Sequence, residues 1–98
     1  MSSGTLNIYF QNIGGMRTKL ETVLKFTKQS IYDVIVVVET SLNEDFFDAE
    51  FCDLDTYSLF RKDRDLCKTN KNKGGGVLIA VRRTLSFFML ICQTLIHY

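Results

Sequence analysis

Several residue types are scarce in this chain, and their scarcity limits which catalytic groups and which cellular compartment the sequence can be expected to have. The 98 residues include no proline, no tryptophan and a single histidine, His97. One histidine at that position leaves almost no material for histidine-based acid–base catalysis. The three cysteines, Cys52, Cys67 and Cys92, are far apart and show no paired spacing. That pattern predicts a reducing intracellular compartment, nuclear or cytoplasmic.

Targeting and membrane signals are also missing. The N-terminus shows no basic start followed by an apolar stretch and a cleavage site, which a secretory signal requires. The apolar tail, residues 84–96, is shorter than the roughly 18 to 20 residues that a membrane-spanning helix needs. Arg82 and Arg83 prevent its extension backwards. We therefore expect no membrane partner.

The charges are unevenly distributed along a chain whose formal net charge is only +1. Residues 39–55 carry seven acids and no base, whereas residues 61–73 carry six bases against Asp63 and Asp65. Arg61, Arg64 and Lys73 are therefore candidate contacts to nucleic-acid phosphates. A solvated loop fits the charge pattern equally well, because the two acids dilute the positive charge.

One stretch, DVIVVVETSL at residues 33–42, organises the rest. Its five consecutive aliphatic residues, Val34–Val38, predict a strand rather than a helix because they are mostly β-branched. A strand with no polar residue on either face is typical of one covered on both sides. With 46% hydrophobic residues, the composition predicts one globular unit.

The remaining elements follow in an alternating order. Residues 5–10 predict a strand, residues 11–15 break it, and the apolar spacing from Met16 predicts a helix that ends near Gln29 or Ser30. A right-handed crossover would place the strands at 5–10 and 34–38 parallel. Residues 40–51 predict a short helix or an irregular turn. Two further strands are predicted at 57–61 and 77–81, separated by the basic loop 62–73.

Asn12 and Glu39 are the first candidate site residues. Each follows a predicted parallel strand, and ligands bind at the carboxyl ends of such strands. An amide and a carboxylate suit Mg²⁺, which keeps several waters and needs few protein ligands. Two simpler readings stay open. Asn12 fits an ordinary turn before Gly14, and Glu39 fits a solvent-facing acid followed by a cap from Ser41 to Glu44.

Taken together, these motifs resemble a known family. They are Gln11-Asn12 with Gly14-Gly15, the DVIVVVETSL stretch with Glu39-Thr40, then Tyr57, Arg61, Asp63 and Arg64, and finally Gly74-Gly75-Gly76-Val77 before an apolar strand. Their order and spacing resemble the start of the apurinic-type endonuclease domain of non-LTR retrotransposons, which accompanies reverse transcriptase. That domain belongs to the endonuclease/exonuclease/phosphatase superfamily. The resemblance covers residues 5–85, so we expect residues 1–85 to be the N-terminal part of such a domain and residues 86–98 to be an apolar tail unlike the family.

The resemblance implies an α/β fold, a partial four-layered α/β sandwich with only the first strands and helix present. It further implies a hydrolase that cleaves DNA phosphodiesters with Mg²⁺, or Mn²⁺. Asn12 matches the family's site asparagine and Glu39 its metal-binding glutamate, so both are expected in the catalytic and metal site. The cation would stabilise charge on the phosphoryl oxygens while water attacks in line. Open sheet edges in such a fragment favour self-association.

The chain departs from the family after Leu85. The later Asp-x-Asn pair and the Ser-Asp-His motif, which supply acid–base and phosphate-orienting groups, have no counterpart in residues 86–98. We therefore expect weak or absent metal binding and no catalysis by the fragment itself. Two alternatives remain: a small nucleic-acid-binding module that uses the basic loop 61–73, and a non-functional remnant of a mobile element.

Overall fold

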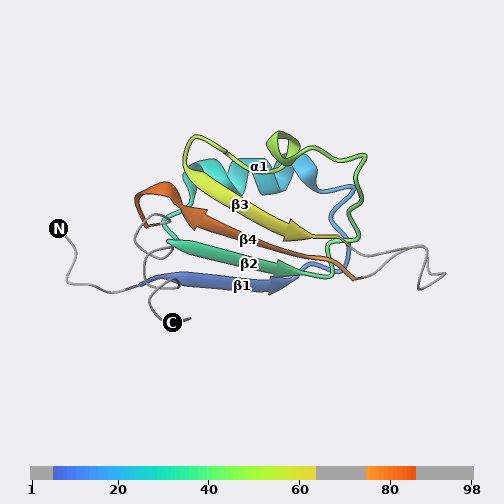
Figure 1. The fold of residues 1–98 in the computed structure, drawn as a ribbon, viewed down its shortest axis with the longest axis horizontal. Coiled ribbons are helices and arrows are strands. Elements are labelled where there is room, and N and C mark those ends of the chain that lie inside the picture. The colour runs from blue at the N-terminus through green and yellow to red at the C-terminus, as the bar shows by residue number, and fades with distance from the viewer. Residues whose placement is uncertain (1–5, 64–74, 86–98) are drawn as a thin grey trace, which may run out of the picture.

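A mixed four-stranded sheet is the centre of the protein (Figure 1). The computed structural model describes residues 6–63 and 75–85. The strands are β1 (Ile8–Asn12), β2 (Val34–Val38), β3 (Tyr57–Lys62) and β4 (Val77–Arg82), and they lie in the order β1-β2-β4-β3. The described residues also form a helix, α1 (Leu20–Gln29), and a short 3₁₀ turn, η1 (Asp48–Glu50). Residues 83–85, directly after β4, are helical as well. The predicted α/β class is confirmed.

The two most apolar strands, β2 and β4, pair with each other at the centre of the sheet. β1 and β2 are parallel, as predicted, with α1 as the crossover between them. β4 is antiparallel to both β2 and β3 and lies between them, so β2 and β4 are the two central strands. These central strands hold the VIVVV and VLIAV runs, because central strands are the ones that bury most surface.

The core lies between one face of the sheet and α1. Alternate residues of the central strands, among them Ile35, Val37, Leu78 and Ala80, face the helix and are at most 4% exposed. Half-buried apolar residues of α1 pack on the same cluster. Side chains alternate along a strand, so the intervening residues form the opposite face of the sheet.

The partial exposure of residues on that opposite face shows that one prediction was wrong. A strand buried on both sides was expected at Val34–Val38, yet Val36 and Val38 are only half-buried. Neither α1 nor η1 covers these two residues, since both pack on the other side of the sheet with the core cluster. The apolar run reflects a central position in the sheet rather than complete cover.

Two predicted boundaries near the N-terminus were also wrong. The strand β1 continues through Gln11 and Asn12, which pair with Val37 and Val38 and so do not break it. The helix begins at Leu20 and not at Met16. Met16 lies in the turn before the helix, where its amide donates to the carbonyl of Thr40 at 3.0 Å, and its side chain is completely buried.

The chain between β2 and β3 is mostly irregular, which is one of the two predicted alternatives. No helix begins at Ser41, so the predicted helix cap from Ser41 to Glu44 does not form. The first helical turn of this segment, η1, begins at Asp48. Lys62 belongs to β3 and not to the predicted basic loop, whose residues 64–73 lie outside the described part. Within the described residues, no helix has the length and apolar character needed to cross a membrane.

Cys52 belongs to this packed region and not to a reactive site. It is a free thiol, 3% exposed, in the core cluster. Burial, with smaller contributions from the carboxylates of Asp53 and Asp48 and an opposing one from Arg83, raises the pKa of the Cys52 thiol to about 11. A thiol of that pKa is protonated at neutral pH, so it is not a nucleophile.

Candidate functional site

Asn12 and Glu39 lie at the same edge of the sheet. β1 and β2 run in the same direction and end together on the right of Figure 1. Asn12 is the last residue of β1 and pairs with Val38, and Glu39 is the residue that follows Val38. The structure therefore places the two predicted site residues on neighbouring strand ends, where open α/β sheets bind ligands.

The backbone immediately after β2 is strained. Glu39 and Ser41 both have φ of +59°, a left-handed conformation in residues other than glycine. Thr40 between them is buried, with 1% of its surface exposed. A left-handed residue that has a Cβ costs roughly 1–2 kcal/mol. Two such residues in three, here named the 39–41 turn, persist only if the surroundings hold them.

Backbone hydrogen bonds from two other segments hold the 39–41 turn. On one side, the amides of Gly15 and Met16 donate to the carbonyls of Glu39 and Thr40 at 2.7 and 3.0 Å. On the other side, the amides of Thr40 and Ser41 donate to Gly76 and Gly75 at 3.3 and 2.9 Å. One flank contacts the turn through Gly15 and Met16 and the other through Gly75 and Gly76, so the turn is fixed between two closely packed backbones.

The side chains of Asn12 and Glu39 make separate local contacts. The amide oxygen of Asn12 accepts a hydrogen bond from the Gly14 amide at 3.1 Å, which is an Asx-type turn. The Oε1 of Glu39 accepts one from the Gly75 amide at 3.1 Å. Neither contact uses all the lone pairs of its oxygen-bearing group. Both residues thus have acceptor capacity left for a cation.

The donor set at this edge fits Mg²⁺ better than a soft metal. The side-chain oxygens that Glu39 and Asn12 offer come from one carboxylate and one amide, the type that hard cations prefer. Within residues 6–63 and 75–85, no group of three or more His, Cys, Asp or Glu side chains is arranged to hold a metal ion. A cation here would therefore need water and substrate oxygens to complete its coordination.

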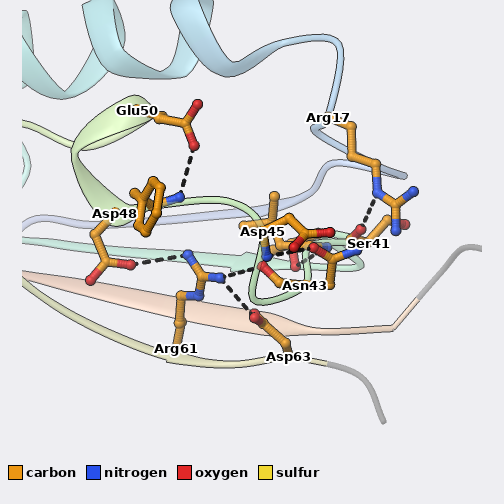
Figure 2. Close-up of polar contacts among 11 residues, drawn as sticks. Arg17, Ser41, Asn43, Asp45, Asp48, Glu50, Arg61 and Asp63 are labelled. Atoms are coloured by element: carbon orange, nitrogen blue, oxygen red, sulfur yellow. Dashed lines mark hydrogen bonds and ion pairs between the residues drawn. The ribbon is translucent and has the colours of Figure 1, made fainter. Parts of the chain in front are cut away.

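Arg17 is a residue of this edge that the sequence reasoning missed. Its Nε donates to the carbonyl of Ser41 (Figure 2). Its guanidinium lies 5.8 Å from the centre of the Phe46 ring. Arg17 itself is exposed. The sequence predicted Arg17 to be one of several cations on the outer face of a helix. It did not predict the turn in which Arg17 contacts Ser41.

The predicted phosphate contact Arg61 is engaged in a different way. Its guanidinium contacts Asp48 at 3.0 Å, Asp63 at 2.8 Å and the carbonyl of Asn43 at 2.7 Å (Figure 2). Its side chain is 14% exposed and lies over the ring of Phe51. Arg61 joins β3 to the irregular segment before it, so its phosphate role remains a prediction. Arg64 and Lys73 lie outside the described residues.

A cavity of about 180 Å³ is present elsewhere, between α1 and the sheet. Most of its lining is apolar, with Tyr9, Phe26 and Val37 among the contributors. Glu39, the acid at the strand edge, does not line it. A site for charged substrates needs convergent polar groups, so this cavity reflects incomplete filling of the core.

Comparisons with protein-family models, curated proteins and solved structures found no match. The functional interpretation therefore depends on the geometry of the strand edge and on the short motifs that resemble the endonuclease family. For Glu39 and Asn12, the geometry is a stronger argument than the motif resemblance, because the structure defines the positions of both residues.

The packing of the 39–41 turn gives a direct prediction. A Cβ at Gly76, where φ is +91°, would lie 2.5 Å from Thr40 Oγ1, whereas a Cβ at Gly14, where φ is +62°, would meet no atom within 4 Å. Both alanine variants pay about 1–2 kcal/mol for the left-handed conformation. We expect Gly76→Ala to lower the free energy of unfolding in urea by clearly more than Gly14→Ala. Equal losses would show that the turn yields to the added methyl group.

Proposed function

We propose that the chain is the N-terminal part of a metal-dependent DNA endonuclease domain of the retrotransposon type. In this proposal the sheet and α1 are the first elements of a four-layered α/β sandwich. Asn12 and Glu39 are the remaining part of its metal site, and the cation is Mg²⁺ or Mn²⁺. The observation that carries the proposal is the strained Glu39 beside the end of the parallel strand that bears Asn12.

The strain at Glu39 supports a functional role for its carboxylate. Glycine adopts a φ of +59° without the Cβ penalty, so a purely structural turn is better served by glycine at position 39. Strained residues cluster at sites where the side chain has a task. The carboxylate receives one hydrogen bond, from Gly75, which aims it without using its full acceptor capacity.

The charges around the turn support a phosphodiester as the substrate class. Arg17 lies on one flank of the 39–41 turn, joined to the carbonyl of Ser41. A guanidinium offers several donors in a plane and binds phosphate oxygens well. A cation between Asn12 and Glu39 would act as a Lewis acid on a phosphoryl oxygen. In this proposal Arg17 contacts a phosphate, while Asn12 and Glu39 hold the cation.

The same chemistry explains why the chain alone is proposed to be inactive. Hydrolysis needs a group that activates water and one that protonates the leaving oxygen. Among the described residues, no histidine is present and no further acid joins Glu39 in a metal-binding group. The proposed role of this chain is therefore to bind a cation and phosphate weakly.

The first prediction concerns metal binding. Addition of Mg²⁺ or Mn²⁺ is expected to shift or broaden the NMR amide signals of Gly14, Glu39 and Gly75 together, with saturation only at millimolar concentration, because two protein ligands hold a hard cation loosely. Glu39→Gln should abolish the joint response. Asp45→Asn, in the exposed acidic segment, is the matched control and should retain it. Shifts confined to residues 44–55 would instead indicate nonspecific screening.

The second prediction concerns catalysis. The 98-residue chain is expected to show no Mg²⁺-dependent nicking of plasmid or abasic DNA, since loss of members of a catalytic set commonly costs orders of magnitude in rate. Supercoiled plasmid should stay intact on a gel under conditions in which Mg²⁺ saturates the amide shifts. Reproducible nicking that disappears in Glu39→Gln but persists in Asp45→Asn would overturn the proposed inactivity.

A further inference from the structure

The outer side of β1 is an unpaired strand edge. β1 lies at one end of the sheet and pairs, among the described strands, with β2 alone (Figure 1). Along a strand, the backbone N–H and C=O groups of successive residues point alternately to the two sides. On an outermost strand, every second residue therefore presents both groups to the outside. Such an edge is a template for another strand.

Hydrogen bonds at the two ends of β1 show which of its residues face β2. Just before the strand, the carbonyl of Asn7 accepts from the amide of Val34 at 3.2 Å. Just after it, the amide of Ile13 donates to the carbonyl of Val38 at 3.1 Å. Because the direction alternates, the odd-numbered residues of β1 direct their backbone groups toward β2.

The even-numbered residues of β1 direct their backbone groups outward. They are Ile8, Phe10 and Asn12, each with one N–H donor and one C=O acceptor on the open side. Within the described part of the chain, no backbone or side-chain group bonds to these donors and acceptors from that side. The edge thus offers three donors and three acceptors in regular alternation.

β1 lacks the features that protect strand edges from other chains. Natural edge strands carry charged side chains, a proline or a bulge. The sequence of β1 is IYFQN, and its register with β2 advances one residue at a time without a bulge. The other edge strand, β3, ends in Arg61 and Lys62, and Arg61 joins it to the irregular segment before it. β1 is therefore the less protected of the two edges.

The side chains beside this edge are apolar and exposed. Leu6, Ile8 and Phe10 alternate along the face opposite α1 and are 45%, 57% and 64% exposed. Tyr9 points to the other face, where its ring lies 4.9 Å from that of Phe26. Backbone groups and apolar side chains that are exposed together mark a contact surface more strongly than either alone.

A second copy of β1 matches this edge in hydrogen bonding. If two β1 strands pair antiparallel with Phe10 opposite Phe10, Ile8 lies opposite Asn12 at both ends. All three outward-facing residues then form hydrogen-bonded pairs, each of which exchanges two N–H···O=C bonds. Every other antiparallel register leaves an outward residue of β1 without a partner in the second β1. A two-fold axis through the Phe10 pair makes the contact self-complementary.

Charge and side-chain packing agree with the same partner. Residues 1–16 contain no Asp, Glu, Lys or Arg side chain, so two copies of this edge meet without like-charge repulsion between side chains. Side chains of directly opposite residues project to the same face. The two Phe10 rings would therefore lie side by side, with Ile8 of each copy next to them along the strands.

We propose that two copies of the chain associate through antiparallel pairing of β1, centred on Phe10, to form one continuous sheet. The contact uses the backbone of Asn12 and leaves its side-chain bond to the Gly14 amide in place. The proposal does not depend on the proposed endonuclease function, since it rests on strand register, exposure and charge.

Two lysine variants of the full 98-residue chain test the proposal by sedimentation velocity over a range of concentrations. Phe10→Lys places two lysines opposite each other at the centre of the proposed contact. Phe60→Lys is the matched control, because Phe60 is 59% exposed, lies on the other edge strand and belongs to the same row through Val36 and Ile79. We expect a monomer–dimer equilibrium whose dissociation constant rises about tenfold or more in Phe10→Lys. Phe60→Lys should leave it unchanged.

Hydrogen exchange in the unmodified chain gives a second test that needs no substitution. The amides of Ile8, Phe10 and Asn12 should exchange more slowly as the protein concentration rises, since each gains a partner only in the dimer. The amides of Tyr9 and Gln11 are the internal control, because they are bonded to β2 in both states. Their exchange should change less.

Three results would overturn the proposal. The first is a chain that stays monomeric at every concentration tested. The second is a dimer that both lysine variants weaken equally, because the contact would then involve the sheet face rather than the β1 edge. The third is a dimer in which Ile8, Phe10 and Asn12 gain no more protection than Tyr9 and Gln11.

Discussion

The hydrogen bonds that fix the 39–41 turn are the constraint on which the site depends. Two left-handed residues follow the central strand β2, and their backbones are held between the Gly15-Met16 and Gly75-Gly76 segments. These segments come from before α1 and from the approach to β4, so the turn joins three distant parts of the chain. Glycine is needed at Gly76 because a Cβ there would meet the Thr40 hydroxyl. The turn thus connects the fold of the sheet to the position of Glu39.

This connection gives the proposed chemistry a physical basis. Glu39 stands in a conformation that its Cβ disfavours, next to the strand end that carries Asn12, and Arg17 donates to the carbonyl of Ser41 in the same turn. In the proposal, the two oxygen donors hold a hard metal ion and the guanidinium contacts a phosphate. Among the described residues, no group of three or more His, Cys, Asp or Glu side chains is arranged to hold a metal ion, which is why the proposal gives this chain weak binding and no catalysis. In this proposal the chain therefore binds a cation and a phosphate without catalysing hydrolysis.

The sequence predicted the parts of the fold that depend on composition and periodicity. The aliphatic runs located β2 and β4, and the βαβ order predicted the parallel pair. It did not predict contacts between residues distant in the chain. The insertion of β4 between β2 and β3 has no local signal, nor does the engagement of Arg61 by Asp48 and Asp63. Met16 shows why helix starts are hard to place, since its apolar side chain fits a helix face but is buried from a turn. The position of Asn12 and Glu39 at neighbouring strand ends was predictable because strand ends are local features, while their role in a site stays a prediction.

The measurement that tests the central claim most directly is the free energy of unfolding of Glu39→Gly compared with Glu39→Gln. If Glu39 is strained and kept for its carboxylate, glycine removes a left-handed penalty of roughly 1–2 kcal/mol that glutamine retains. The account predicts that Glu39→Gly is more stable than Glu39→Gln by about 1 kcal/mol, while both variants lose the response to Mg²⁺. A Glu39→Gly variant that is no more stable than Glu39→Gln, or that still binds Mg²⁺ like the parent chain, would contradict the account.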